Sequence, residues 1–200
     1  MSLYSFVLFT HVMSAIGLFV GLTLEGFVSI RIGRAADTEQ IRFFTRAFDR
    51  LRWIFIPSFA GILLGGLYLG YRYGGGTFWI PAALIATLAI MIIGGLMTGR
   101  PMSRLKKATV DAEIAFHSLS TQAKSPQLAL SYGLRVGLAL GIVFLMTAKP
   151  DVWPSTFALI VGCIAGVAVA SGIRKNWTRT GAGCGPWRGS IQRTPDAPIH

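Results

Sequence analysis

The stretch THVMSAIGLFVGLTLEG, residues 10–26, is an apolar run that carries a histidine at position 11 and a glutamate at position 25. It belongs to a longer apolar segment, and a bilayer core needs about 20 such residues to be crossed as a helix. Neither an imidazole nor a carboxylate is favourable in lipid, so both side chains must point into a protein interior. The stretch therefore predicts a membrane helix with one polar face.

The composition of the whole chain agrees with this prediction. Of its 200 residues 52% are hydrophobic and 14% charged, with a mean hydropathy of +0.57, whereas soluble domains carry about 25% charged residues. A net charge of +11 would suggest nucleic acid as a partner of a soluble protein. Here the basic residues flank apolar runs, which indicates contact with anionic lipid headgroups and no nucleic-acid partner. Cys163 in an apolar run and Cys184 in a basic tail predict no disulfide.

Five apolar runs are long enough to cross a membrane. The expected fold class is an all-α polytopic membrane helix bundle with one five-helix domain, residues 1–175, and a flexible basic cytoplasmic tail, residues 176–200. The first run lacks the basic start and cleavage site of a signal peptide, so it is interpreted as a retained helix. The expected spans are about 3–30, 53–71, 78–98, 128–147 and 153–173.

Lysine and arginine alternate between the connections. The four connections and the tail hold 6, 1, 5, 1 and 5 of them in chain order, and Arg135 is left inside a span. Positively charged connections stay on the cytoplasmic side. The pattern predicts an N-terminus outside and a C-terminus in the cytoplasm.

The two basic connections are expected to be partly helical. Asp37 and Gln40 resemble a capping box, and Ser103 is a candidate cap for a second helix to about Leu119. Two interpretations stay open: these helices lie on the inner headgroup surface, or they dock a protein partner. The two sparsely charged connections, at 74–76 and 149–151, are expected to be tight turns.

Every expected span contains two glycines four residues apart. Small residues at this spacing let membrane helices approach closely, which predicts a compact bundle. The pairs are Gly17/Gly21, Gly61/Gly65, Gly95/Gly99, Gly137/Gly141 and Gly162/Gly166.

The polar intramembrane site is expected to contain His11, Ser14, Glu25 and Arg135. His11 and Glu25 are 14 residues apart, which places them on one helix face within about 40°, with Ser14 between them. Arg135 lies at the depth of Glu25 in the fourth span, and a buried charge needs a partner. The expected Glu25–Arg135 contact has two interpretations: a pair that fixes the bundle, or part of a path for a solute or a proton.

His11 leaves three interpretations open. It is hydrogen-bonded to a backbone carbonyl or to Ser14, or it is a haem ligand, or it belongs to a copper-type or proton-carrying site with Met146 and Cys163. The other histidines, His117 and His200, lie in an inner connection and at the last position. Phosphate-binding loops, paired CxxC motifs, HExxH and GxSxG are all missing from the sequence, which favours a protein that is not an enzyme.

Three segments resemble a known family: FTHVMSAIGLFVGLTLEGFVSIRI at 9–32, FDRLRWIFIPSFAGILLGGLYL at 48–69 and FLMTAKP at 144–150. They are similar to small bacterial membrane proteins grouped as domain of unknown function 2269, and more loosely to CopD-like copper-resistance proteins. The likeness covers about residues 3–150, so the fifth span would be an addition. It implies the bacterial inner (plasma) membrane, and the looser relatives imply haem or copper near His11. In the fourth span the family's Met–x–x–Lys–Pro corresponds to Met146, Lys149 and Pro150.

Together these observations predict a multi-pass inner-membrane protein that binds or transports a metal, haem or small polar solute through a polar bundle interior. A haem-dependent redox protein and a structural or accessory subunit are the alternatives. The lipid bilayer is the expected partner, and a second copy or another protein stays open.

Overall fold

A computed structural model of the chain describes residues 2–35, 37–73, 77–109 and 125–181, with side chains to residue 174. The regular structure in these ranges is entirely helical. Five helices or continuous helical rods in the described part are long and apolar enough to cross a membrane. The expected five-helix bundle is confirmed at this level. Of the expected flexible tail, residues 176–200, the first six are helical up to Gly181, so the tail begins later than expected. The remainder, with Cys184 and His200, lies outside the described residues, as does His117.

Helix α1 (Leu3–Gly33) and helix α2 (Thr38–Tyr73) form the first antiparallel pair. Ser2 begins α1 by accepting a 3.3 Å hydrogen bond from the Ser5 amide. Asp37 begins α2 in the same way, because its Oδ1 accepts a 2.8 Å hydrogen bond from the Gln40 amide. The expected cap at Asp37 is therefore present, and the Gln40 side chain also donates to the Asp37 carboxylate at 3.2 Å.

Helix α2 does not stop between the basic connection and the membrane. Its 36 residues give a length of about 54 Å, whereas the hydrocarbon core is about 30 Å thick. The segment expected as a separate surface helix is thus the first part of α2. Pro57 lies inside this helix without ending it, as membrane helices tolerate.

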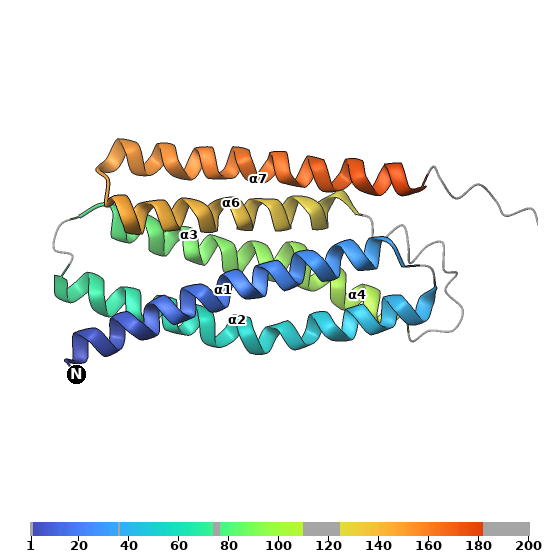
Figure 1. The fold of residues 1–200 in the computed structure, drawn as a ribbon, viewed down its shortest axis with the longest axis horizontal. Helices are drawn as coiled ribbons and strands as arrows, with labels where there is room; N and C mark the ends of the chain where they lie inside the picture. Colours follow the sequence, from blue (N-terminus) through green and yellow to red (C-terminus); the bar gives the residue numbers. More distant parts are fainter. Residues whose placement is uncertain (1, 36, 74–76, 110–124, 182–200) are drawn as a thin grey trace, which may run out of the picture.

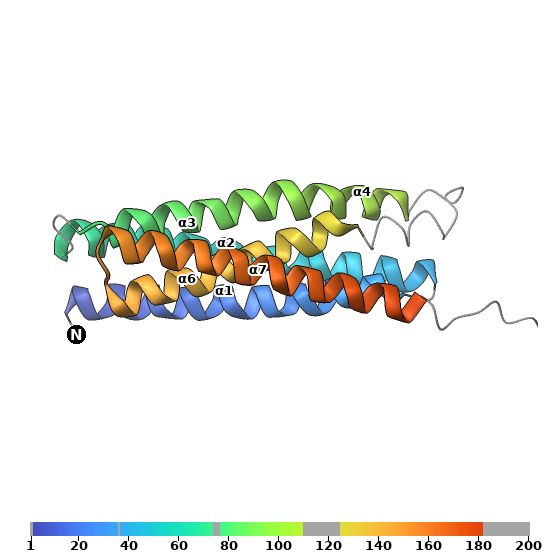
Figure 2. The ribbon, with the colours of Figure 1, turned by 90° about the horizontal axis from the view of Figure 1, so that it is seen from above.

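The third span is also longer than expected. Helix α3 (Trp79–Ile93), the π-helix η1 (Gly94–Gly99) and helix α4 (Arg100–Ala108) make one continuous rod, which Figure 2 shows most clearly. Ser103 lies inside α4, so its expected role as a helix cap is wrong. The expected continuation to Leu119 lies outside the described residues.

The ends of α1, α2 and α4 pack against one another beyond the apolar centre. Their shared cluster contains Val28, Ile32, Ile41, Met102 and Leu105, and Lys106 of α4 forms an ion pair with Asp49 of α2. The apolar faces of the two inner helical segments are therefore used within the chain. Neither segment is a separate surface helix in the described part, and their contact with the inner headgroups or with a protein partner stays a prediction.

Helix α6 (Pro126–Ala148) and helix α7 (Val152–Gly181) form the second antiparallel pair. They are joined by the expected tight turn, in which Lys149 has a φ of 46° and its amide donates to the Leu145 carbonyl. In α6, 56% of the most apolar window is buried, against 17–22% for the other four spans. Helix α6 is thus the central helix, between α7 and α3 in Figure 1.

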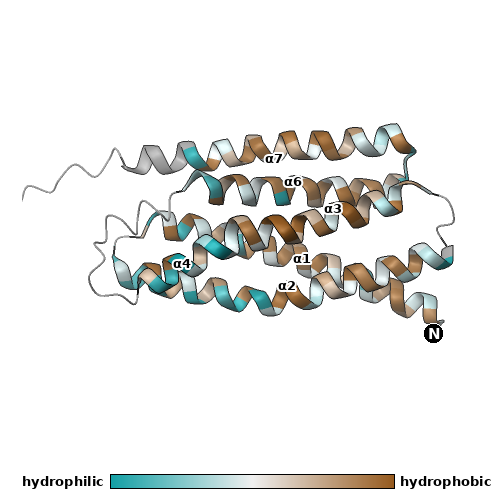
Figure 3. Cartoon of the chain, turned by 180° about the vertical axis from the view of Figure 1, so that it is seen from behind, coloured by the Kyte–Doolittle hydropathy of each residue, from teal (hydrophilic) through white to brown (hydrophobic). Residues whose placement is uncertain are grey.

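Hydrophobic residues occupy the middle of the helices, and hydrophilic residues gather around α4 and the neighbouring start of α2 (Figure 3). Large apolar side chains are exposed along the spans, for example Phe9, Leu64 and Phe157. Such an apolar exterior is what a lipid environment solvates.

Candidate functional site

Glu25 of α1 and Arg135 of α6 form an ion pair inside the bundle. The Glu25 side chain is 1% exposed and the Arg135 side chain 5% exposed. Arg135 Nη1 donates to Glu25 Oε2 at 2.7 Å, and Arg135 Nη2 donates to Glu25 Oε1. Both carboxylate oxygens therefore meet the Nη1–Nη2 edge of one guanidinium, a bidentate geometry that is among the strongest for such a pair. The contact expected from the sequence is present.

The other donors of Arg135 reach two further groups. Nη2 donates to Thr98 Oγ1 at 3.0 Å, and Nε donates to the Ser131 carbonyl at 3.2 Å. The hydroxyls of Thr98 and Ser131 are 2.8 Å apart, and both side chains are buried. The network of Glu25, Arg135, Thr98 and Ser131, here called the polar network, thus joins three spans.

The π-helix η1 shapes the side of the polar network that faces α3. Thr98 belongs to η1, and the Ser131 hydroxyl also lies 3.5 Å from the carbonyl of Ile93, directly before η1. A Cβ on Gly94 would lie 3.0 Å from Arg135 Nη1, so glycine leaves the room that the guanidinium occupies. Single π turns inside α-helices occur often at functional sites.

Gly94, Thr98 and Ser131 were not among the residues expected from the sequence. Ser131 precedes Arg135 by one helical turn, which is the signal that could have identified it. Tyr132 lies beside the same region, because a Cβ on Gly26 would overlap its hydroxyl. No sequence pattern indicates which hydroxyl of another span meets an arginine.

His11 and Ser14 lie away from the polar network and pack against α2. A Cβ on Gly61 would overlap the Ser14 hydroxyl, and a Cβ on Gly65 would lie 3.0 Å from the His11 Cβ. His11 and Glu25 are separated by about 21 Å along the helix axis. Although α1 carries both residues, it presents His11 to α2 and Glu25 to α6, so the structure does not bring them into one site.

Of the three expected metal ligands, His11 and Cys163 pack against different parts of the bundle, and Met146 lies in α6. His11 lies against Gly65 and Gly66 of α2, whereas Cys163 packs against the core cluster that contains Leu138 and Ala139. Among the described residues no three His, Cys, Asp or Glu side chains lie close enough to hold a metal ion. His11 Nδ1 is buried without a hydrogen-bond partner there. The expected hydrogen bond to a carbonyl or to Ser14 is therefore missing at this nitrogen.

The glycine pairs of α6 and α7 lie at the contact between these two helices. A Cβ on Gly162 would lie 2.5 Å from the Gly137 carbonyl oxygen. A Cβ on Gly133 or on Gly166 would likewise overlap the carbonyl oxygen of the other glycine. Gly141 was expected to allow an equally close approach of the two backbones, but the backbones are farther apart there. A Cβ there would lie 3.1 Å from Leu159 Cδ2 and 3.5 Å from the Ala158 carbonyl oxygen. The closest backbone contact is therefore at Gly137 and Gly133, and Gly141 faces a leucine side chain instead.

The glycine pairs of the first three spans differ from one another. Gly17, Gly21, Gly61 and Gly65 face side chains across the contact of α1 with α2. In the third span, Gly95 has no neighbour within 4 Å, and Gly99 meets only the Gly94 carbonyl of its own rod. The expected packing role of the Gly95/Gly99 pair is wrong, because η1 turns Gly94 toward α6 instead.

Comparisons of this chain with protein-family models, with curated proteins and with solved structures give no match. The likeness to the family of domain of unknown function 2269 and to CopD-like proteins stays an expectation. Any function must be argued from the residues and their geometry.

Proposed function

We propose that this chain is a multi-pass membrane protein that binds or transports a small polar solute through its interior, with the Glu25–Arg135 pair as the site. The buried ion pair carries this proposal. Removing two charges from water is expensive, and hydrophobic residues of similar volume often stabilise a protein as well or better. Charged groups at membrane depth therefore mark solute, ion or proton paths by default.

Each half of the Glu25–Arg135 pair can exchange its present partner for a solute of matching charge. An anionic solute would take the two Nη groups of Arg135, whereas a cation or a proton would take the carboxylate of Glu25. Thr98 and Ser131 supply hydroxyls that donate or accept in either case. The pair connects α1 to α6, so a solute that replaces one half of it would loosen the contact of the two helices.

The proposed membrane is the bacterial inner membrane, with the N-terminus outside and the C-terminus in the cytoplasm. The hydrophilic end of the bundle around α4 (Figure 3) holds the two basic connections, and such connections remain cytoplasmic. The likeness of residues 3–150 to small bacterial membrane proteins supports the same assignment. Contact with anionic lipids at this face follows from it.

The experiment is a set of concentration jumps on proteoliposomes adsorbed to a solid-supported membrane. The probes are sodium acetate, sodium phosphate, ammonium chloride and glycine. We expect at least one probe to give a current absent from protein-free liposomes. Glu25→Gln and Arg135→Gln should each lower it at least about tenfold, which corresponds to 1.4 kcal/mol. Arg72→Gln is the matched control, because it removes one exposed charge in the last turn of α2, away from the polar network. This variant should preserve the current.

Currents that both variants preserve would overturn the assignment of the site. If no probe gives a current, the transport proposal falls, and a structural or accessory subunit becomes the better interpretation. Four of the five N–H donors of Arg135 have partners within the polar network, which favours that second candidate because the network is largely satisfied without a ligand.

The unpartnered His11 Nδ1 is the one observation that favours a ligand for haem or copper. Among the described residues no group of three His, Cys, Asp or Glu side chains includes it, so no step is assigned to haem or copper. An absorbance spectrum and a metal analysis, on protein from cells supplied with haem precursor and copper, test it. A Soret band that disappears in His11→Phe would replace the solute proposal by a haem protein.

A further inference from the structure

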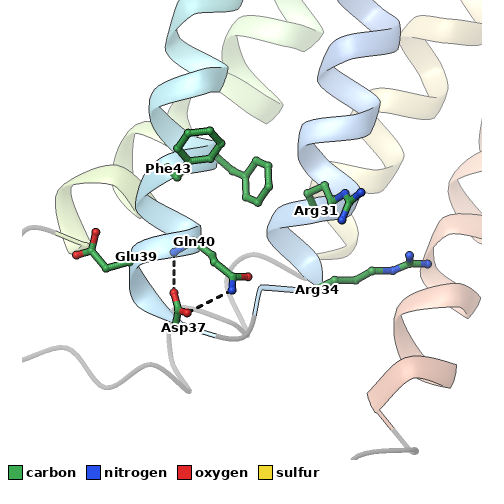
Figure 4. A pocket seen from close by; sticks show the side chains of 7 residues that line it. Arg31, Arg34, Asp37, Glu39, Gln40 and Phe43 are labelled. Atoms are coloured by element: carbon green, nitrogen blue, oxygen red, sulfur yellow. Dashed lines mark hydrogen bonds between the residues drawn. The ribbon is translucent and has the colours of Figure 1, made fainter.

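A second polar region lies where α1 ends and α2 begins. An open hollow of about 520 Å³ lies there, and Figure 4 shows the side chains that line it: Arg31, Arg34, Asp37, Glu39, Gln40, Phe43 and Phe44. It lies at the end of the first span, which ends at Gly33. This hollow is separate from the polar network, so a ligand bound in it would not depend on the proposed function.

Among the described residues, the two acidic side chains of the hollow have hydrogen-bond or ion-pair partners, whereas its two arginines form no ion pair. Asp37 accepts two hydrogen bonds from Gln40, at 2.8 and 3.2 Å, and Glu39 pairs with Arg42 at 3.2 Å. Arg31 and Arg34 form no ion pair in the described part of the chain. Both arginines are exposed at the end of α1, Arg31 in its last turn and Arg34 as its C-cap.

Exposed aromatic side chains continue from this hollow onto the apolar surface. Phe43 is 67% exposed and Phe27 is 52% exposed, and the Arg31 guanidinium lies 5.1 Å from the centre of the Phe27 ring. Arginine next to an exposed ring at the end of a span matches a headgroup above and an acyl chain below. A soluble anion without an acyl chain would make no apolar contact with these rings.

We propose that this hollow binds one anionic phospholipid, with its phosphate between Arg31 and Arg34 and an acyl chain along Phe27 and Phe43. The charge complementarity identifies the anionic headgroup, and the position at the end of a span identifies the lipid. A zwitterionic lipid offers a phosphate too, but its own cationic group cancels much of the attraction of its headgroup to the two arginines.

The test is native mass spectrometry of the purified protein in mild detergent, titrated with dioctanoyl phosphatidylglycerol and with dioctanoyl phosphatidylcholine. We expect phosphatidylglycerol to bind at least about tenfold more tightly. The double variant Arg31→Gln with Arg34→Gln should bind phosphatidylglycerol at least about tenfold more weakly, since each basic residue near an anionic lipid surface adds to the binding free energy. The matched control, Arg100→Gln with Arg104→Gln, removes the same charge from α4 and should change the affinity less than twofold.

Equal weakening in both double variants would show attraction by net charge alone and overturn the site. Equal binding of the two lipids would overturn the preference for an anionic headgroup. Displacement of the lipid by 10 mM inorganic phosphate would show that the acyl chain contributes nothing to binding, and would overturn its proposed contact with Phe27 and Phe43. If the first double variant does not fold, Arg31→Lys with Arg34→Lys replaces it. That variant should keep most of the affinity, because the charges remain.

Discussion

His11 of α1 and Phe55 of α2 occupy equivalent places in two copies of one packing motif. Three residues after each begins the pattern Ser–x–x–Gly–x–x–x–Gly, at Ser14 and at Ser58. The helices cross so that each serine covers the first glycine of the other copy, while His11 covers Gly65 and Phe55 covers Gly21. His11 thus has a packing role, whatever else it binds.

The first prediction uses this equivalence. Phe55 shows that a flat phenyl ring fits such a place, so His11→Phe should change the free energy of unfolding by less than about 1.5 kcal/mol, as volume-conserving swaps do. His11→Ala should cost about 2 kcal/mol, because it leaves a gap beside Gly65. Thermal unfolding in mild detergent measures both. A large loss in His11→Phe would show that the imidazole itself is needed.

The second prediction concerns the contact of α6 with α7. Gly162→Ala puts a methyl group 2.5 Å from the Gly137 carbonyl oxygen, so the helices must separate, at a cost of about 1–3 kcal/mol. Gly172→Ala in the same helix meets no atom within 4 Å and should be neutral or slightly stabilising, since alanine favours helices. Chemical unfolding compares the two. Equal effects would contradict the close contact.

The third prediction isolates one hydroxyl of the polar network. Thr98→Val removes the acceptor for Arg135 Nη2 and the partner of Ser131 while keeping the shape of the side chain. We expect a loss of about 1 kcal/mol. Thr87→Val is the control, because the Thr87 hydroxyl donates only to the Ala83 carbonyl of its own helix. If Thr87→Val costs as much, the network adds nothing beyond a local bond.

The fourth prediction tests the orientation of the chain. In a variant without Cys163 and Cys184, a cysteine is placed either at Asp151 or at Glu39. A membrane-impermeant maleimide should label the first in intact cells and the second only after permeabilisation, because basic connections stay inside. The opposite labelling pattern would reverse the proposed topology.

The sequence was sufficient for the number of spans and for the central ion pair. Hydropathy is a local property, so each span can be identified without its neighbours. Glu25 and Arg135 were matched because few charges lie in the spans and each needs a partner at its own depth. Both arguments depend on lipid as a solvent and need no three-dimensional information.

The helix ends and the π-helix could not be predicted in the same way. Nothing between Thr38 and Tyr73 interrupts the helix, and the apolar residues near Ile41 find partners on α1 and α4 that only the fold provides. The π turn at Gly94–Gly99 lies directly against Arg135 and Ser131 of another span, and these contacts depend on the fold. The sequence does not distinguish Thr98 from other threonines of membrane helices, which commonly bond their own backbone as Thr87 does.

The most direct test of the central claim is a double-mutant cycle on Glu25 and Arg135, measured by unfolding in mild detergent. Glu25→Ala and Arg135→Ala should each cost about 3 kcal/mol, since each leaves a buried charge without its partner. The double variant should cost little more than either one, which gives a coupling of about 2 kcal/mol or more. Losses that simply add would contradict the claim that the two charges act as one unit within the membrane.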